Sequence, residues 1–152
     1  AEAAVSRTGF DQIEFLFAPN PGEPFKPLKA IASSGEMARV MLALKTVLAT
    51  QDSIPILVFD EVDSNLGGET AGVVGEKMKQ IGANRQVLCI THLAPVAAAG
   101  HRHYLVSKEV VEGRTLTRVT QLDGESRVEE LTRMLGGGGA AARQHAKELL
   151  AK

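Results

Sequence analysis

Apolar positions along the chain recur at two spacings, one typical of helices and one typical of strands. Helical spacing runs from 34 to 50 and from 68 to 82, while IPILVF (54–59) and QVLCIT (86–91) are short apolar runs typical of buried strands. Strand, helix and strand in this order predict a βαβ unit with parallel strands and a right-handed crossover. The predicted inner faces are Met37, Val40, Met41, Leu44, Val47 and Leu48 in the first helix and Val73, Val74, Met78 and Ile81 in the second.

The segment before the first helix is less regular. Residues 10–18 (FDQIEFLFA) carry apolar side chains at nearly alternating positions, which predicts a strand. Residues 19–32 contain PNPGEPFKP, with four prolines in nine residues, and are expected to form an irregular connection. Residues 1–8 are either the end of a coiled coil or a remnant of cloning, and no prediction rests on them.

The segment after the βαβ unit predicts a hairpin and two helices. YLVSKEVV and TLTRVTQL flank a turn at 112–114 that contains Gly113, which favours a β-hairpin. A helix is expected over 126–135, opened by a capping box of Ser126 and Glu129, and another over 140–151. The glycines at 136–139 separate these helices and should be flexible.

Composition narrows the class of protein. The 152 residues are 44% hydrophobic and 23% charged with a net charge of −1, as expected for one soluble α/β domain spanning 1–152 and without a global basic field for nucleic acid. Cys89 is the only cysteine, which favours a reducing compartment. No apolar run is long enough for a membrane span and no signal peptide opens the chain, so a cytoplasmic location is expected.

Carboxylates and a histidine follow the two predicted buried strands. Asp60 and Glu61 come directly after the first strand, and Thr91 and His92 come at the end of the second. Since ligands bind outside the carboxyl ends of parallel strands, one crossover brings these side chains to one edge of the sheet. An Asp there can hold Mg²⁺ directly or through water, a neighbouring Glu can activate a water, and a His can contact a phosphate.

Simpler interpretations of the same residues stay open. An apolar run followed by two acids is common by chance, and Asp63 and Asn65 are also ordinary turn formers. A lone histidine after a strand, such as His92, is more often a cap or a satisfied core group.

The first predicted helix begins with SSGE. Ser33 as N-cap places Glu36 at N3, which is a capping box. Capping does not explain Gly35, because glycine lowers helix propensity by about 1 kcal/mol relative to alanine. A glycine there predicts the close approach of another group to the backbone. Free amides and the positive end of the dipole also suit phosphate, so this helix start is a candidate γ-phosphate contact.

Three stretches then carry a family resemblance. ASSGEMARVMLALK, ILVFDEVDSNLGG and VLCITHLAPVAAAGHRHYLVSKE, in this order, resemble the C-terminal lobe of an ABC-type ATPase head, within the SMC-like branch of DNA-repair ATPases. The resemblance runs from about Gly9 to the C-terminus. It implies an α/β fold, the C-terminal half of a P-loop ATPase head, with a mostly parallel sheet flanked by helices, a β-hairpin and C-terminal helices.

The resemblance also implies a nucleotide contact at the helix start. Ser33, Ser34, Gly35 and Glu36 correspond to the signature motif, which contacts the ATP of a partner head. The family usually has two glycines in this motif, and Ser34 stands at the first. A side chain there weakens the approach of the opposing phosphate or adds a donor to it.

Four further residues receive roles by the same resemblance. Asp60 ends the Walker B strand and helps to hold Mg²⁺, directly or through water, while Glu61 polarises the attacking water. Asp63 belongs to the D-loop, which crosses the dimer interface near ATP. His92 corresponds to the switch histidine near the γ-phosphate and is the second candidate catalytic residue.

The motif that would grip the nucleotide is absent from the sequence. G-x-x-x-x-G-K-[ST] does not occur, and in the nearest stretch, GGETAGVVGEK, Glu76 stands where lysine should follow glycine. The resemblance therefore implies a separate N-terminal Walker A lobe joined through a coiled coil, a second head in a homodimer, and DNA as a partner of the full protein. The expected location is the bacterial cytoplasm, associated with the nucleoid.

Three functional hypotheses follow. In the first, the chain is half of an ATPase head that hydrolyses ATP on head dimerisation in DNA double-strand break repair, and is inactive alone. In the second, it is a docking lobe that hydrolyses nothing. In the third, Asp60, Glu61 and Asp63 form an acidic Mg²⁺ cluster of the topoisomerase-primase kind, which leaves SSGE and His92 unexplained.

Overall fold

The predicted βαβ unit is present in the computed structural model of the chain. The structure describes residues 7, 9–11, 13–18, 21–30, 33–48 and 53–151. Strands β3 (Ile56–Phe59) and β4 (Gln86–Cys89) pair in parallel, with Ile56 beside Gln86 and Phe59 beside Cys89. Helix α2 (Gly68–Gly82) connects the two strands, at the bounds that its apolar spacing predicts.

Strand β3 is buried on one face only and β4 is only half-buried on one face, so the prediction of two buried strands is wrong for this chain. Leu57 and Phe59 point into the core, whereas Ile56 and Val58 point to solvent, and Val58 is 64% exposed. Leu88 and Ile90 extend the same exposed face on the neighbouring strand. Continuous apolar runs indicate burial on two faces, and here helices cover only one.

The core of this part of the chain lies between the sheet and helices α1 and α2. Helix α1 (Ser34–Val47) begins after its N-cap Ser33 and buries Leu42, a position outside its predicted inner face, while Met41 and Val47 are exposed. On α2 the predicted Val74, Met78 and Ile81 are buried, but Val73 is exposed. The buried cluster consists of Leu42, Leu57, Phe59, Val62, Ala71, Val74, Met78, Ile81 and Val96.

The N-terminal segment contains two short strands. β1 (Leu16–Phe17) pairs antiparallel with β2 (Lys26–Pro27), and a 3₁₀ turn, η1 (Leu28–Ala30), follows. The strand predicted over 10–18 is therefore reduced to its end, and the stretch 19–32 is not wholly irregular. Residues 12, 19, 20, 31 and 32 lie outside the described residues, as do 1–6, 8, 49 and 50.

The hairpin is confirmed. β5 (His103–Val111) and β6 (Arg114–Leu122) pair antiparallel along their whole length. Glu112 and Gly113 form the two-residue turn with φ of 50° and 76°. Positive φ at both positions is the requirement of a type I′ turn, whose twist matches that of the strands.

The C-terminal bundle consists of α3 (Ala94–Ala99), α4 (Gly124–Met134) and α5 (Ala140–Leu150). The sequence pattern does not predict α3, and it places the start of α4 two residues too late. Asp123 is the N-cap of α4 and forms a capping box with Ser126, so the expected box of Ser126 and Glu129 is wrong. The bundle buries Ala94, Ala97, Val128, Leu131 and Ala146.

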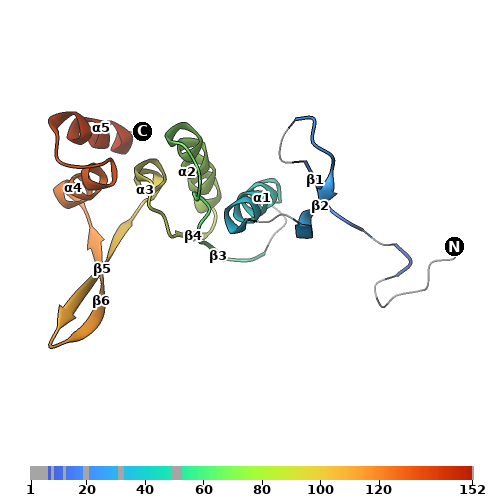
Figure 1. Cartoon of the computed structure of the whole chain (residues 1–152), viewed down its shortest axis with the longest axis horizontal. Coiled ribbons are helices and arrows are strands. Elements are labelled where there is room, and N and C mark those ends of the chain that lie inside the picture. Colours follow the sequence, from blue (N-terminus) through green and yellow to red (C-terminus); the bar gives the residue numbers. More distant parts are fainter. Residues whose placement is uncertain are drawn as a thin grey trace.

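The predicted mostly parallel sheet is the largest correction to the fold class. Within the described residues the strands form three separate two-stranded sheets, of which only β3–β4 is parallel. Figure 1 shows α1, α2 and α3 one after another along the long axis, with α4 and α5 together at one end and the β5–β6 hairpin projecting from the rest. The α/β character, the parallel pair and the hairpin are as predicted. In the described part of the chain, no helix is long and apolar enough to cross a membrane.

Candidate functional site

The loops after β3 and β4 meet, as the βαβ topology predicts. Asp63, in the loop after β3, accepts a hydrogen bond from Thr91 Oγ1 through its Oδ2 and another from the backbone N–H of His92 at 3.2 Å. His92 Nδ1 lies 3.6 Å from the same oxygen. The carboxyl ends of the two parallel strands are thereby joined by one buried carboxylate.

The two partners in this network differ in exposure. Asp63 is only 1% exposed, whereas the side chain of His92 is 70% exposed. Thr91 also accepts a hydrogen bond from the backbone N–H of Leu93 at 3.0 Å, which fixes the start of the following helix. A buried carboxylate that accepts both hydrogen bonds through one oxygen positions the backbone around His92, while the exposed imidazole remains available to a ligand. No sequence pattern predicted that Thr91 would bind Asp63.

The start of α1 lies against the loop after β3. Ser33 Oγ accepts a hydrogen bond from the backbone N–H of Glu36 at 3.2 Å, so the predicted cap is present. Ser34, one residue on, donates its hydroxyl hydrogen bond to Glu61 Oε2. The predicted signature and Walker B segments therefore touch within this one chain.

Gly35 is needed for that contact. A Cβ at Gly35 would collide with Ser64 Oγ and would lie 3.0 Å from the carbonyl oxygen of Glu61. The predicted close approach at this glycine is confirmed, but the group that comes close belongs to the chain's own loop. Arg39, one turn further along α1, donates to the carbonyl oxygens of Val62 at 3.3 Å and Ser64 at 3.1 Å.

The loop itself has a defined turn. The backbone N–H of Ser64 donates to the carbonyl oxygen of Glu61 at 3.0 Å, and Glu61 has a φ of 57°. A non-glycine residue in this left-handed region persists only where its surroundings fix the conformation. We call residues 33–36, 60–64 and 91–92 together the site edge.

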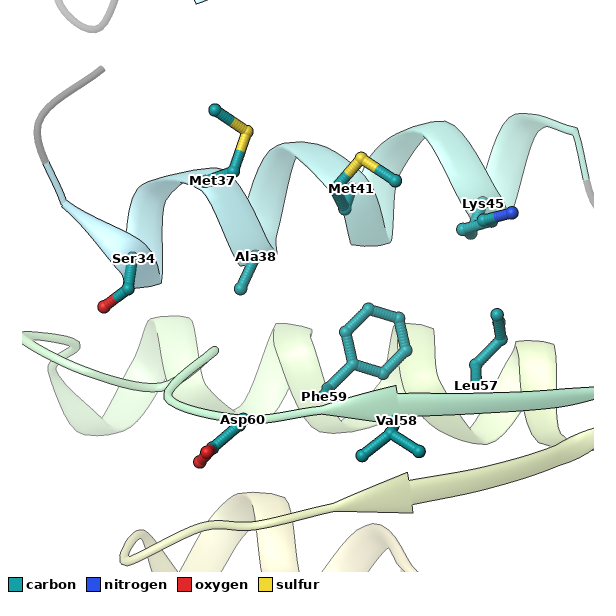
Figure 2. A pocket seen from close by; sticks show the side chains of 9 residues that line it. All are labelled: Ser34, Met37, Ala38, Met41, Lys45, Leu57, Val58, Phe59 and Asp60. Atoms are coloured by element: carbon teal, nitrogen blue, oxygen red, sulfur yellow. The ribbon is translucent and has the colours of Figure 1, made fainter. Parts of the chain in front are cut away.

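Asp60 is one of the residues that line a groove between α1 and β3. Figure 2 shows Leu57 and Phe59 pointing toward α1, while Val58 and Asp60 point away from it. The carboxylate of Asp60 is exposed. The groove is lined by Ser34, Met37, Ala38, Met41, Lys45, Leu57, Val58, Phe59 and Asp60.

The carboxylates of Asp60, Glu61 and Asp63 do not gather into a metal cage. Across the described ranges, no group of three or more His, Cys, Asp or Glu side chains is arranged to hold a metal ion. The reason is visible in their contacts, since Glu61 is bound to Ser34 and Asp63 to Thr91. The acidic-cluster hypothesis therefore has no geometric support.

Cys89, at the end of β4, lies near the carboxylates of Asp60 and Asp63. Burial raises the pKa of its thiol to about 12, and the nearby negative charges of Asp63 and Asp60 add to the shift. A thiol with so high a pKa carries almost no thiolate at neutral pH, so it is a packing group rather than a nucleophile.

Comparison with solved structures defines the class of fold. The chain superposes on the Smc head domain with a coiled coil and joint of Pyrococcus yayanosii with a TM-score of 0.56, at 22% identity, over 88% of this chain and 25% of that one. The Smc head domain of Pyrococcus furiosus, solved with the C-terminal domain of ScpA, gives 0.54 at 25% identity, over 74% and 27%. The chain has the fold of part of an SMC ATPase head domain.

Sequence comparison then identifies the nearer relatives. The chain is 48% identical to DNA repair protein RecN of Xylella fastidiosa over 91% of its length, and 48% identical to RecN of Deinococcus radiodurans over 99%. RecN of Treponema pallidum is also 48% identical, over 98%. This chain is a homologue of RecN, as the three motif stretches indicated. It spans about a quarter of the length of these relatives. No protein-family profile matches it.

Proposed function

We propose that this chain is the C-terminal lobe of an SMC-like ATPase head that binds and hydrolyses ATP when two heads engage during DNA double-strand break repair. The observation that carries the proposal is the site edge. The hydrogen bonds of Asp63 join the loop after β3 to Thr91 and His92, and Ser34 joins the start of α1 to Glu61. The segments that the resemblance assigns to nucleotide chemistry therefore form one continuous surface.

The side chains at this surface fit Mg²⁺ and ATP in chemical type. Asp60 has an exposed carboxylate of the kind that hard cations prefer, and it would hold Mg²⁺ directly or through water. Glu61 would orient and deprotonate the attacking water, and His92 would donate a hydrogen bond to the γ-phosphate. The bound Mg²⁺ would neutralise the charge that develops on the phosphate oxygens.

The start of α1 would serve the nucleotide of the second head. Ser33 to Glu36 lie at the positive end of the dipole of a 14-residue helix, a position that favours phosphate. Asp63 would then support the interface between the two heads from its buried position.

The exposed face of the β3–β4 sheet supports an additional lobe. Ile56, Val58, Leu88 and Ile90 form an apolar face that nothing in the described residues covers. Parallel sheets are covered on both faces in α/β proteins. We infer that a Walker A lobe of the same protein covers this face, with a coiled coil between the lobes. DNA would bind through the full protein, in the cytoplasm at the nucleoid.

The proposal is tested with Glu61→Gln in the full-length protein. The variant should bind ATP as tightly as the wild type, lose hydrolysis by at least about 10²-fold and accumulate engaged heads, because the water loses its base. ATP turnover, nucleotide binding and size-exclusion chromatography measure the three properties. Glu76→Gln, on the exposed side of α2, is the matched control and should behave as wild type. Wild-type turnover by Glu61→Gln would refute the proposed role of Glu61.

The docking-lobe hypothesis remains the second candidate for the isolated chain. The uncovered apolar face and the missing phosphate loop both favour it. The purified 152-residue chain should hydrolyse ATP negligibly, and addition of a separately produced Walker A lobe should restore turnover. Robust hydrolysis by the chain alone would contradict this division of the site.

A further inference from the structure

Ser34 occupies a position where the family that this chain resembles usually has glycine. Its side chain makes a contact that is not a step of the ATP hydrolysis proposed above. Its hydroxyl donates to the carboxylate of Glu61, 27 positions further along the chain. Glycine at this position would have no side chain to offer. The contact therefore ties the start of the signature helix to the proposed catalytic base of the same head.

The backbone beneath this contact is held independently of the Glu61 side chain. Arg39 fixes the carbonyl oxygens of Val62 and Ser64, and the hydroxyl of Ser64 donates to the carbonyl oxygen of Glu61 at 2.9 Å. The absence of a side chain at Gly35 lets the turn pack directly on α1. Opening the hydrogen bond from Ser34 would free the carboxylate while the turn stays in place.

The carboxylate of Glu61 can also move away from the Ser34 hydroxyl. Glu61 and Ser34 are both exposed, so water can replace the hydrogen bond between them at little net cost. Asp63, two residues along the same loop, is buried and hydrogen-bonded and has no such freedom. The loop thus combines a fixed carboxylate with a releasable one.

We propose that Ser34 is a positioning residue that holds Glu61 in a resting orientation, and that hydrolysis requires this hydrogen bond to open. The inference rests on the proposed function, in which α1 faces the nucleotide of the partner head while Glu61 serves the nucleotide of its own head. A carboxylate bound to Ser34 is directed at the partner-facing surface and away from its own water. When a partner's phosphate takes the Ser34 hydroxyl, Glu61 is released, so occupancy of one composite site activates the other.

The test is steady-state ATP turnover by the full-length protein with Ser34→Ala and Ser34→Thr. Ser34→Ala removes the donor and should raise kcat about fivefold, the scale of the modest net contribution of one typical hydrogen bond. It should also lower the Hill coefficient for ATP toward one. Ser34→Thr keeps a hydroxyl, so its kcat should rise less than that of Ser34→Ala. A weaker contact with the partner's phosphate would appear in KM, which separates it from the release of Glu61.

Two further variants separate release of the carboxylate from loosening of the loop. Ser34→Gly also lacks the hydroxyl and should raise kcat as Ser34→Ala does, which provides a second variant if either folds poorly. Ser64→Ala removes a hydroxyl that bonds the backbone of Glu61, and it should not raise kcat. An unchanged or lower kcat in both Ser34→Ala and Ser34→Gly would overturn the inference, as would an equal rise in Ser64→Ala.

The outcome for the proposed function is read separately from Glu61→Gln. If Glu61→Gln stops hydrolysis while the Ser34 variants turn over like wild type, the proposed function stands and the role of Ser34 is refuted. If the wild-type protein does not hydrolyse ATP, or Glu61→Gln is fully active, both proposals fail.

Discussion

The site edge and the C-terminal bundle differ in how completely residues of this chain cover their apolar side chains. In the bundle, Leu131 and Ala146 are fully buried, and Arg127 donates from its Nη2 to the carbonyl oxygens of Ala97 at 3.2 Å and Ala98 at 3.0 Å. At the site edge the sheet beneath the loops leaves Ile56 and Val58 exposed. The bundle is packed within this chain, whereas the sheet beneath the site edge is open on one apolar face.

The largest expected effect is on stability and tests the packing of the C-terminal bundle. Leu131→Ala removes a fully buried side chain from the bundle and should lower the free energy of unfolding by about 3 kcal/mol, since the cavity cannot be filled by solvent. Val58→Ala, at an exposed position of β3, is the control and should cost less than about 0.5 kcal/mol in the 152-residue chain. Urea unfolding measures both.

The same Val58→Ala variant tests whether the sheet is covered in the full-length protein. If a second lobe covers the β3–β4 sheet, Val58→Ala should there cost about 1 kcal/mol, because its methyl groups become buried. An equally small cost in the chain and in the full-length protein would show that the face stays open. A small cost for Leu131→Ala would contradict the view of the bundle as a tightly packed unit.

Within the site edge, smaller effects on stability and turnover should distinguish the buried Asp63 from the largely exposed His92. Asp63→Ala leaves the hydroxyl of Thr91 and the amide of His92 without their acceptor, and should cost about 2 kcal/mol of stability as well as turnover. His92→Ala removes a largely exposed ring and should leave stability within about 0.5 kcal/mol while reducing turnover about 10²-fold. Thermal unfolding and ATP turnover of the full-length variants measure the pair.

The opposite results would change the roles assigned to Asp63 and His92. Normal turnover in His92→Ala would return the histidine to the status of a strand cap. Unchanged stability in Asp63→Ala would show that water replaces the lost acceptor, and that the loops are not held together by this carboxylate.

Sequence patterns predicted the parts of the fold that depend on local spacing. The bounds of α2, the hairpin turn at Gly113 and the parallel pairing of β3 with β4 follow from periodicity, turn chemistry and crossover length. The prediction of a mostly parallel sheet was wrong because sheet formation depends on which strands pair. Apolar runs do not specify the pairing partners. Helix α3 was missed because APVAAA is short and lacks a polar face.

The candidate site was predictable to the same extent. Topology predicted that Asp60 and Glu61 lie at the same edge as Thr91 and His92, because strand ends of a βαβ unit converge. The direction of each side chain was not predictable, since it depends on φ values such as that of Glu61 and on contacts such as that of Ser34. Gly35 indicated a close approach correctly, but the sequence could not tell an approaching phosphate from the chain's own loop.

The smallest expected effect concerns pH and belongs to the bundle. The hydrogen bonds from Arg133 to Glu130, at 2.8 and 2.6 Å, lower the pKa of this nearly buried carboxyl below its usual value of 4.5, and the charge of Arg133 adds to the shift. A carboxyl with a lowered folded pKa stabilises the protein above its unfolded pKa, and this contribution is lost as the pH falls through the folded pKa. The stability of the bundle should therefore fall below about pH 4.5.

Glu130→Gln tests this dependence, since glutamine keeps the shape but does not titrate. The urea midpoint of the variant should be lower at pH 7 and should change less than that of the wild type between about pH 5 and pH 3. His103 contributes in a different range, because burial and the nearby Arg127 lower its pKa below 6.5, so its charging destabilises the fold already as the pH falls below that value. An identical acid loss in Glu130→Gln and wild type would mean that Arg133, which is 70% exposed, holds the carboxyl too weakly to stabilise the bundle.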